Sequence, residues 1–195
     1  MSAAPRVPSP AAPWRPTPAE IAAAVDRVIP DVVGPGLRVL FCGINPGLYS
    51  GAVGHHFARP GNRFWPTLHA AGFTPRLFSP FEDASLLALG LGVTNLVERT
   101  TATAAELGRD ELERGGRRLA AKLRRLRPQW IAPLGLAAYR TAFGRAKAVV
   151  GPQAETVGHT RIWLLPNPSG LNASWQPPDL ARAFGELARE VGMAV

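Results

Sequence analysis

The chain has 195 residues, 46% of them hydrophobic, which is enough for one globular domain with a substantial core. Its single cysteine, Cys42, excludes a disulfide framework, a cysteine-rich zinc site and a four-cysteine iron–sulfur cluster, and it fits a reducing cytoplasm. A net charge of +8 favours a polyanionic partner such as nucleic acid, although the 22 basic residues include only two lysines, a bias that a GC-rich genome also produces.

The first residues differ in composition from the rest. Residues 1–16 hold five prolines, two arginines and no acidic residue, and are expected to form a disordered or polyproline-like tail. Residues 17–195 are expected to form the single folded domain. No apolar run reaches the roughly 18 residues of a membrane span, and the first residues do not resemble a signal peptide, so we expect no membrane association.

The first half of the domain contains helix and strand signals in alternation. A capping box at 17–20, with proline at the first helical position, predicts a helix that runs to about residue 29. The apolar run 37–42 predicts a buried strand that ends at Gly43. A loop rich in glycine and proline is expected to about residue 61, followed by a helix over 62–71.

The second half continues the alternation. A short helix near 83–89 and a strand around 92–97 precede the longest predicted helix, 110–126, whose leucine stripe faces the core and whose basic residues form a solvated face. A strand over 129–134 and a helix over 136–143 follow.

A hairpin and a closing helix complete the chain. The segments 155–157 and 161–165 flank Gly158-His159-Thr160 and predict the hairpin. A second loop rich in proline, glycine and asparagine spans 166–178, and a helix over 179–191 closes the domain. Because strands alternate with helices and no internal repeat is present, the sequence predicts an α/β fold with a mostly parallel sheet.

Two loops follow the carboxyl ends of predicted strands, at 43–47 and 167–172. Ligand sites of open α/β sheets are built at that edge. Both loops lie in long stretches without aspartate or glutamate, 32–81 and 156–178, as a surface that faces phosphates requires.

The residues of these loops limit the chemistry that they can perform. Phosphate-binding, dinucleotide-binding, serine-hydrolase and zinc-deaminase signatures are absent from the sequence. Asn45 and Asn167 each carry an amide, which positions water or reads a base edge but does not act as a general base; both could instead stabilise turns. His55 and His56 are interpreted as polar loop residues, with DNA backbone contact as the alternative.

Two motifs carry a family resemblance. Gly43-Ile44-Asn45-Pro46-Gly47 and Asn167-Pro168-Ser169-Gly170-Leu171 resemble the signature motifs of the mismatch-specific uracil/thymine DNA glycosylases, family 2 of the uracil-DNA glycosylase superfamily. The segments 57–65 and 92–97 resemble the same family, and the similarity runs from about residue 37 to the final helix. The second motif is similar to that of the bacterial branch, which prefers uracil.

The resemblance implies a three-layer α/β/α sandwich and a DNA repair enzyme. The expected activity is that of a monofunctional glycosylase that flips uracil, or ethenocytosine, from G·U-type mismatched duplex DNA and hydrolyses the N-glycosidic bond, leaving an abasic site. The implied enzyme uses no cofactor and no metal, and acts as a cytoplasmic, nucleoid-associated monomer. Two alternatives stay open: a non-catalytic binder of mismatched or abasic DNA, and a nucleoside or nucleotide hydrolase.

The resemblance also implies roles around the base. Asn45 would hold the attacking water, Phe57 would stack on the flipped base, and Asn167 would hydrogen-bond to the pyrimidine edge. Ser50 would lie near the 5-position of the pyrimidine, and Ile44 would also contact the substrate.

The same resemblance assigns a wedge and shows two departures. Gly170 and Leu171 would enter the duplex where the base has left. Asn172-Ala173 stands where the bacterial branch often has Ser-Arg, and Asn95 where relatives carry a charged residue.

Overall fold

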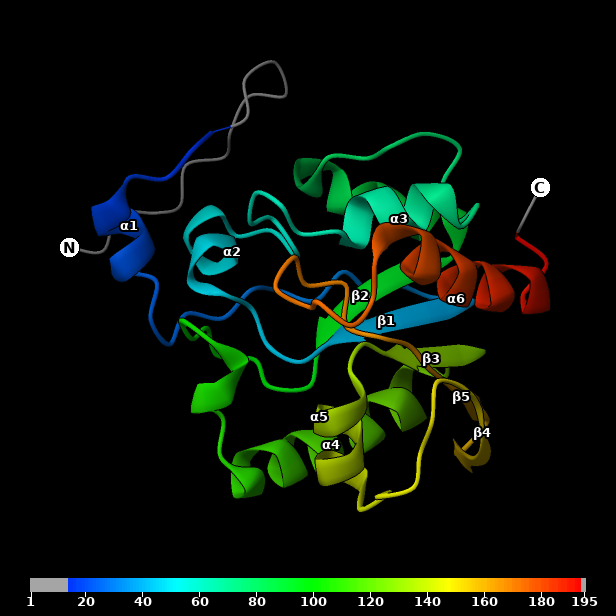
Figure 1. Ribbon diagram of the computed structural model, residues 1–195. Helices are drawn as coiled ribbons and strands as arrows, with labels where there is room; N and C mark the ends of the chain where they lie inside the picture. Colours follow the sequence, from blue (N-terminus) through cyan, green and yellow to red (C-terminus); the bar gives the residue numbers. More distant parts are fainter. Residues whose placement is uncertain (1–13, 194–195) are drawn as a thin grey trace.

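The computed structural model describes residues 14–193, which form a five-stranded sheet with helices on both faces (Figure 1). The strands lie in the order β2 (Leu91–Asn95), β1 (Val39–Gly43), β3 (Trp130–Pro133), β5 (Thr160–Leu164), β4 (Gly151–Val157). All neighbours are parallel except β4, which runs antiparallel to β5. The expected α/β fold with a mostly parallel sheet is therefore confirmed.

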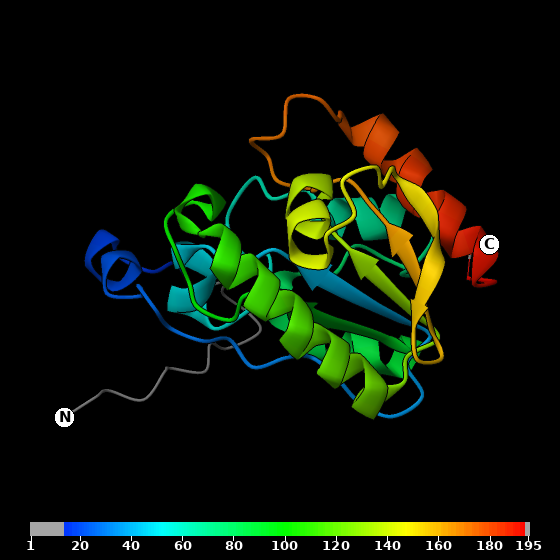
Figure 2. The ribbon, with the colours of Figure 1, turned by 90° about the horizontal axis from the view of Figure 1, so that it is seen from below.

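Helices cover the two faces of the sheet in pairs. On one face lie α3 (Phe64–Ala70) and α6 (Pro177–Glu190), and on the other lie α4 (Arg109–Leu126) and α5 (Leu136–Phe143) (Figures 1 and 2). The four helices agree with the predicted ones to within two residues at each start. Together with the sheet they make the three layers that the resemblance implies.

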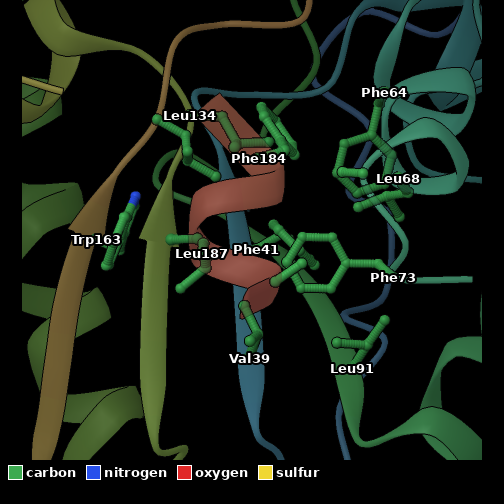
Figure 3. Packing of buried hydrophobic residues seen from close by; sticks show 14 of the residues in the cluster. Val39, Phe41, Phe64, Leu68, Phe73, Leu91, Leu134, Trp163, Phe184 and Leu187 are labelled. Atoms are coloured by element: carbon green, nitrogen blue, oxygen red, sulfur yellow. The ribbon is translucent and has the colours of Figure 1, made fainter. Parts of the chain in front are cut away.

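Strand β1 lies in the middle of the core because both of its faces are buried. Val39 and Phe41 belong to the cluster under α3 and α6, whereas Leu40 and Cys42 belong to the cluster under α4 and α5. The Phe41 ring meets the Phe73 ring edge to face, with centroids 5.1 Å apart (Figure 3). Burial on both sides explains why this strand is a continuous apolar run rather than an alternating one.

The first helix is shorter than predicted. The capping box on Thr17 is present, but α1 spans only Pro18–Ala22. The chain then turns at Asp26, which has a left-handed backbone (φ 59°), and Val28 forms an isolated bridge with Arg99. Pairing with residues 99–100 thus replaces the later helical turns, because tertiary contacts outweigh the weak propensity of a short helix.

A short helix, α2 (Leu48–Val53), occupies part of the predicted loop. Glycines flank it: Gly47 is the N-cap and Gly54 ends the helix with a left-handed backbone (φ 78°). The glycine content that suggested a loop therefore supplies the two caps.

The remaining elements differ only in detail. The predicted short helix is a 3₁₀ helix, η1 (Pro80–Leu89), and a one-turn 3₁₀ helix, η2 (Ala104–Glu106), was not predicted. Strand β4 begins at Gly151, four residues before the predicted segment. Residues 1–13 of the expected tail lie outside the described residues. Within 14–193, no helix combines the length and apolar character needed to cross a membrane.

Candidate functional site

The carboxyl ends of β1 and β5 open on one hollow of about 250 Å³. It lies where the loop after β1, the helix α2 and the loop before α6 come together (Figure 1). Six of the seven residues predicted to form the site line it: Ile44, Asn45, Ser50, Phe57, Asn167 and Leu171. The seventh, Gly170, lines an adjacent hollow of about 240 Å³ together with Leu171. The structure thus brings the two sequence motifs, 120 residues apart, to one place.

The Asn45 side chain is oriented by its amide nitrogen. Nδ2 donates to Thr101 Oγ1 at 2.7 Å and to the carbonyl oxygens of Arg99 and Pro46, each at 3.2 Å. Thr101 donates its own hydroxyl proton to the Thr103 carbonyl at 2.7 Å, so its oxygen is free to accept from Asn45. Asn45 Oδ1 has no hydrogen-bond partner among residues 14–193. The carbonyl end of this amide is therefore the end available to a water molecule.

The Asn167 side chain is held by its amide oxygen, whereas that of Asn45 is held by its amide nitrogen. Its Oδ1 accepts from the Ser169 backbone N–H at 3.0 Å, and its backbone carbonyl accepts from Asn172 Nδ2 at 2.9 Å. Asn167 Nδ2 has no partner within 14–193. The residue does stabilise a turn, and at the same time it presents a hydrogen-bond donor at the hollow.

The base of the hollow is aromatic. The Phe57 ring stacks on the Phe64 ring at the start of α3, with centroids 4.0 Å apart. Phe57 has a left-handed backbone (φ 54°), a conformation that non-glycine residues rarely adopt. A Cβ on Gly43 would lie 3.2 Å from Phe57 Cζ and 2.5 Å from Asn95 Oδ1. Glycine at the end of β1 therefore allows both side chains to approach the strand.

Ser50 and Ile44 are fixed by their surroundings. Ser50 is buried on α2, and its Oγ accepts from the Ala58 backbone N–H at 3.0 Å, directly after Phe57. Ile44 is half-buried against the cluster under α4 and α5.

His56 and Asn95 form a buried hydrogen-bonded pair that the sequence did not predict, and both line the hollow. His56 is only 2% exposed; its Nε2 lies 3.0 Å from the Pro30 carbonyl, and its Nδ1 lies 3.2 Å from Asn95 Nδ2. A carbonyl only accepts, so Nε2 carries the proton and Nδ1 accepts from Asn95. Burial lowers the pKa of His56, despite the raising effect of the Pro30 hydrogen bond, and thus favours its neutral form.

Both histidines are polar residues of the loop after α2, as predicted, but the alternative of a DNA backbone contact is excluded for His56, which is buried. His55 pairs with Asp83 at 3.1 Å and packs edge-on against Phe81. Adjacent residues on a turn point in different directions, so the His-His dipeptide carried no signal of this difference.

The electrostatics of the hollow are set by what lines it. None of the described lining residues carries a carboxylate: most come from the acid-free stretches, and the others, Asn95, Leu134 and residues 101–104, add none. The exposed Arg59 lies at the mouth, and its side chain has no ion pair or hydrogen bond with residues 14–193. No group of three or more side chains within 14–193 could hold a metal ion. The lining groups can therefore orient a ligand and hydrogen-bond to it, and they place no negative charge beside it.

Comparisons with known proteins identify the family of the chain and a similar fold. The family model described as "Uracil DNA glycosylase superfamily" matches residues 30–188. The solution NMR structure of a putative uracil DNA glycosylase from Methanosarcina acetivorans is similar in fold, with a TM-score of 0.53 and 18% sequence identity. The similarity covers 84% of this chain and 98% of that one.

Proposed function

The chain belongs to the uracil DNA glycosylase superfamily, and from this premise we propose that it is a monofunctional glycosylase that removes uracil from G·U mismatches in duplex DNA. One observation carries the proposal: Asn45, Asn167 and Leu171 line the same hollow, and Leu171 is 77% exposed. A leucine left in water beside a polar pocket suits a reader of duplex DNA, because an apolar wedge can replace the extruded base. We expect the enzyme to act as a cytoplasmic monomer without a cofactor.

The hollow would receive the base after it leaves the stack. Extrusion costs a few kcal/mol, and less from a G·U wobble than from a normal pair, which supplies part of the selectivity. The Phe57 ring offers a face on which the base stacks. Asn167 Nδ2, which has no partner within 14–193, would donate to a carbonyl oxygen of uracil. Ser50 and Ile44 would border the pyrimidine ring.

The chemistry would depend on positioning rather than on proton abstraction. As the bond between the sugar C1′ and the base N1 breaks, its electron pair goes to uracil and positive charge develops on the sugar, where DNA phosphates can stabilise it. A water held by Asn45 Oδ1 then adds to C1′ and loses its proton to solvent. An acid-free pocket with preorganised donors favours the uracil anion as leaving group. Without a carboxylate base the reaction should be slow compared with sugar hydrolases.

Gly170 and Leu171 would fill the gap that the base leaves. A Cβ on Gly170 would lie only 2.5 Å from the Gly61 carbonyl oxygen, so glycine is needed for the two loops to approach each other. Leu171, the next residue, lines both the hollow and the adjacent one, and would be free to enter the duplex. Ethenocytosine is a second candidate substrate for the same pocket.

The deciding experiment is formation of abasic sites in a G·U duplex, read as strand cleavage after alkali. We expect cleavage at the uracil position by the wild-type chain. Tight binding of the mismatch without cleavage would instead support a non-catalytic binder. Hydrolysis of deoxyuridine in the absence of any activity on DNA would support a nucleoside hydrolase.

A further inference from the structure

Arg63 binds the loop that carries the proposed wedge at both of its ends and near its tip. We call residues 168–175 the wedge loop. The backbone N–H of Arg63 donates to the Pro168 carbonyl at 3.0 Å, and its Nη1 donates to the Trp175 carbonyl at 2.6 Å. Its Nη2 donates to the carbonyls of Gly170 at 2.9 Å and Asn172 at 3.0 Å. One residue before α3 thus connects four positions of a segment more than a hundred residues away.

These contacts make Arg63 different from the arginines that would meet DNA. Its Nη1 and Nη2 both donate to backbone carbonyls, whereas the side chain of Arg59, on the same loop, has no partner within 14–193. The carbonyls are uncharged, so the fork geometry of the guanidinium, rather than its charge alone, decides the fit. These contacts indicate that Arg63 stabilises a loop of the protein itself rather than binding DNA phosphates.

The position of Arg63 also links the wedge to the pocket. The next residue, Phe64, provides the ring on which Phe57 stacks. Gly61, two residues before Arg63, has its carbonyl oxygen only 2.5 Å from where a Cβ on Gly170 would lie. The start of α3 therefore packs against Phe57 in the hollow and also binds the wedge loop.

We propose that Arg63 is a positioning residue that presets the wedge loop, so that Leu171 enters the duplex without first being ordered. This inference rests on the proposed function. A loop that is ordered before binding does not lose its conformational freedom when DNA binds. The contribution of Arg63 should therefore appear on duplex DNA, where the wedge acts, and hardly at all on single-stranded DNA.

The test compares single-turnover excision of uracil from a G·U duplex and from a single strand. Arg63→Ala should lower duplex excision about tenfold to a hundredfold, the range expected for the loss of charge-assisted hydrogen bonds, and single-strand excision by less than about threefold. Arg63→Lys keeps the charge but not the fork, and should remain close to Arg63→Ala. Arg125→Ala, an exposed arginine on the solvent side of α4, is the matched control and should leave both rates unchanged.

A double-mutant cycle with Leu171→Ala separates positioning from general stability. If Arg63 acts through Leu171, Arg63→Ala should add little to the duplex defect of Leu171→Ala. Full additivity, equal losses on duplex and single strand, or complete rescue by lysine would each overturn the inference. If Arg63→Ala does not fold, the same cycle is carried out with Arg63→Lys. A wild-type chain that excises nothing from the G·U duplex would refute the proposed function instead.

Discussion

Replacement of Asn45 by alanine should remove most of the excision rate while leaving DNA binding intact. The proposed role of this residue is to hold water through Oδ1, and alanine removes that oxygen without adding bulk or charge. The residues that would bind the DNA and the base, among them Phe57, Asn167 and Leu171, are left in place by the substitution. Affinity for a G·U duplex should therefore persist, whereas the chemical step should not.

The structure allows the magnitudes to be worked out. Asn45→Ala loses three hydrogen bonds from Nδ2, and each contributes a net of about 0.5–1.5 kcal/mol. Thr101 keeps its bond to the Thr103 carbonyl, so its hydroxyl is not left unsatisfied. A loss of about 1.5–4.5 kcal/mol lies below the stability of a typical domain, about 5–15 kcal/mol, so the variant should fold. Loss of one preorganised polar group from a transition state predicts a rate lowered about 10²–10³-fold.

Thr101→Val is the matched variant for the orientation of the amide. It has nearly the same shape but lacks the oxygen that accepts from Asn45 Nδ2 at 2.7 Å. Asn45 keeps its two carbonyl partners, so we expect an intermediate loss of about tenfold, since one hydrogen bond of about 1.4 kcal/mol is worth that factor.

The assay is single-turnover excision from a G·U duplex across pH, with binding and thermal unfolding measured in parallel. Because an amide does not titrate and no carboxylate lines the hollow, the wild-type rate should lack an acidic limb of carboxylate origin above about pH 5. Normal cleavage by Asn45→Ala would refute the water-holding role. If Asn45→Ala loses both DNA binding and folding, the role of Asn45 is to stabilise a turn rather than to hold water.

Asn167→Ala should lower uracil excision at least about tenfold with the fold intact, since it removes a donor worth about 1–3 kcal/mol to a buried partner; wild-type rates would contradict the assignment. Leu171→Ala should reduce excision from duplex DNA more than from single strands, and equal losses would point to packing alone. Gly43→Ala should weaken affinity for uracil-containing DNA, measured by titration, because the new Cβ would press on Asn95. Burial lowers the pKa of His56 in the folded state, so below about pH 6.5 the unfolded chain binds more protons than the folded one, and stability should decrease as the pH is lowered. The melting temperature of His56→Gln should depend less on pH in this range.

The sequence predicted the features that follow from local chemistry. The continuous apolar run of β1 predicts a buried strand, and the amphipathic pattern of α4 predicts a helix with one face on the core. The carboxyl ends of parallel strands share one edge of a sheet, so the sequence alone predicts that the motif loops after β1 and β5 lie together. The expected lining of the hollow followed from that placement, although the roles of its residues stay predictions.

The features that escaped prediction depend on contacts between distant residues. His56 and Asn95 are 39 positions apart, and Arg63 and Trp175 are 112 apart. A histidine on a glycine-rich turn has no local pattern that indicates burial, and an arginine followed by a helix has none that indicates a carbonyl cluster. The early end of α1 has the same origin, since the bridge of Val28 with Arg99 competes with its last turns.

A pocket without carboxylates implies that positioning produces the rate. Neutral groups cannot take a proton from water. They also do not repel the uracil anion that develops in the proposed reaction, whereas a nearby carboxylate would raise the energy of that anion by charge repulsion. In the proposed mechanism the positive charge on the sugar would be stabilised by phosphates of the substrate itself, which would favour nucleic acid over free nucleosides. Under these conditions every group that fixes the geometry before binding contributes directly to the barrier. Thr101, which orients Asn45, and Arg63, which holds the wedge loop, should therefore affect excision more than their distance from the scissile bond suggests.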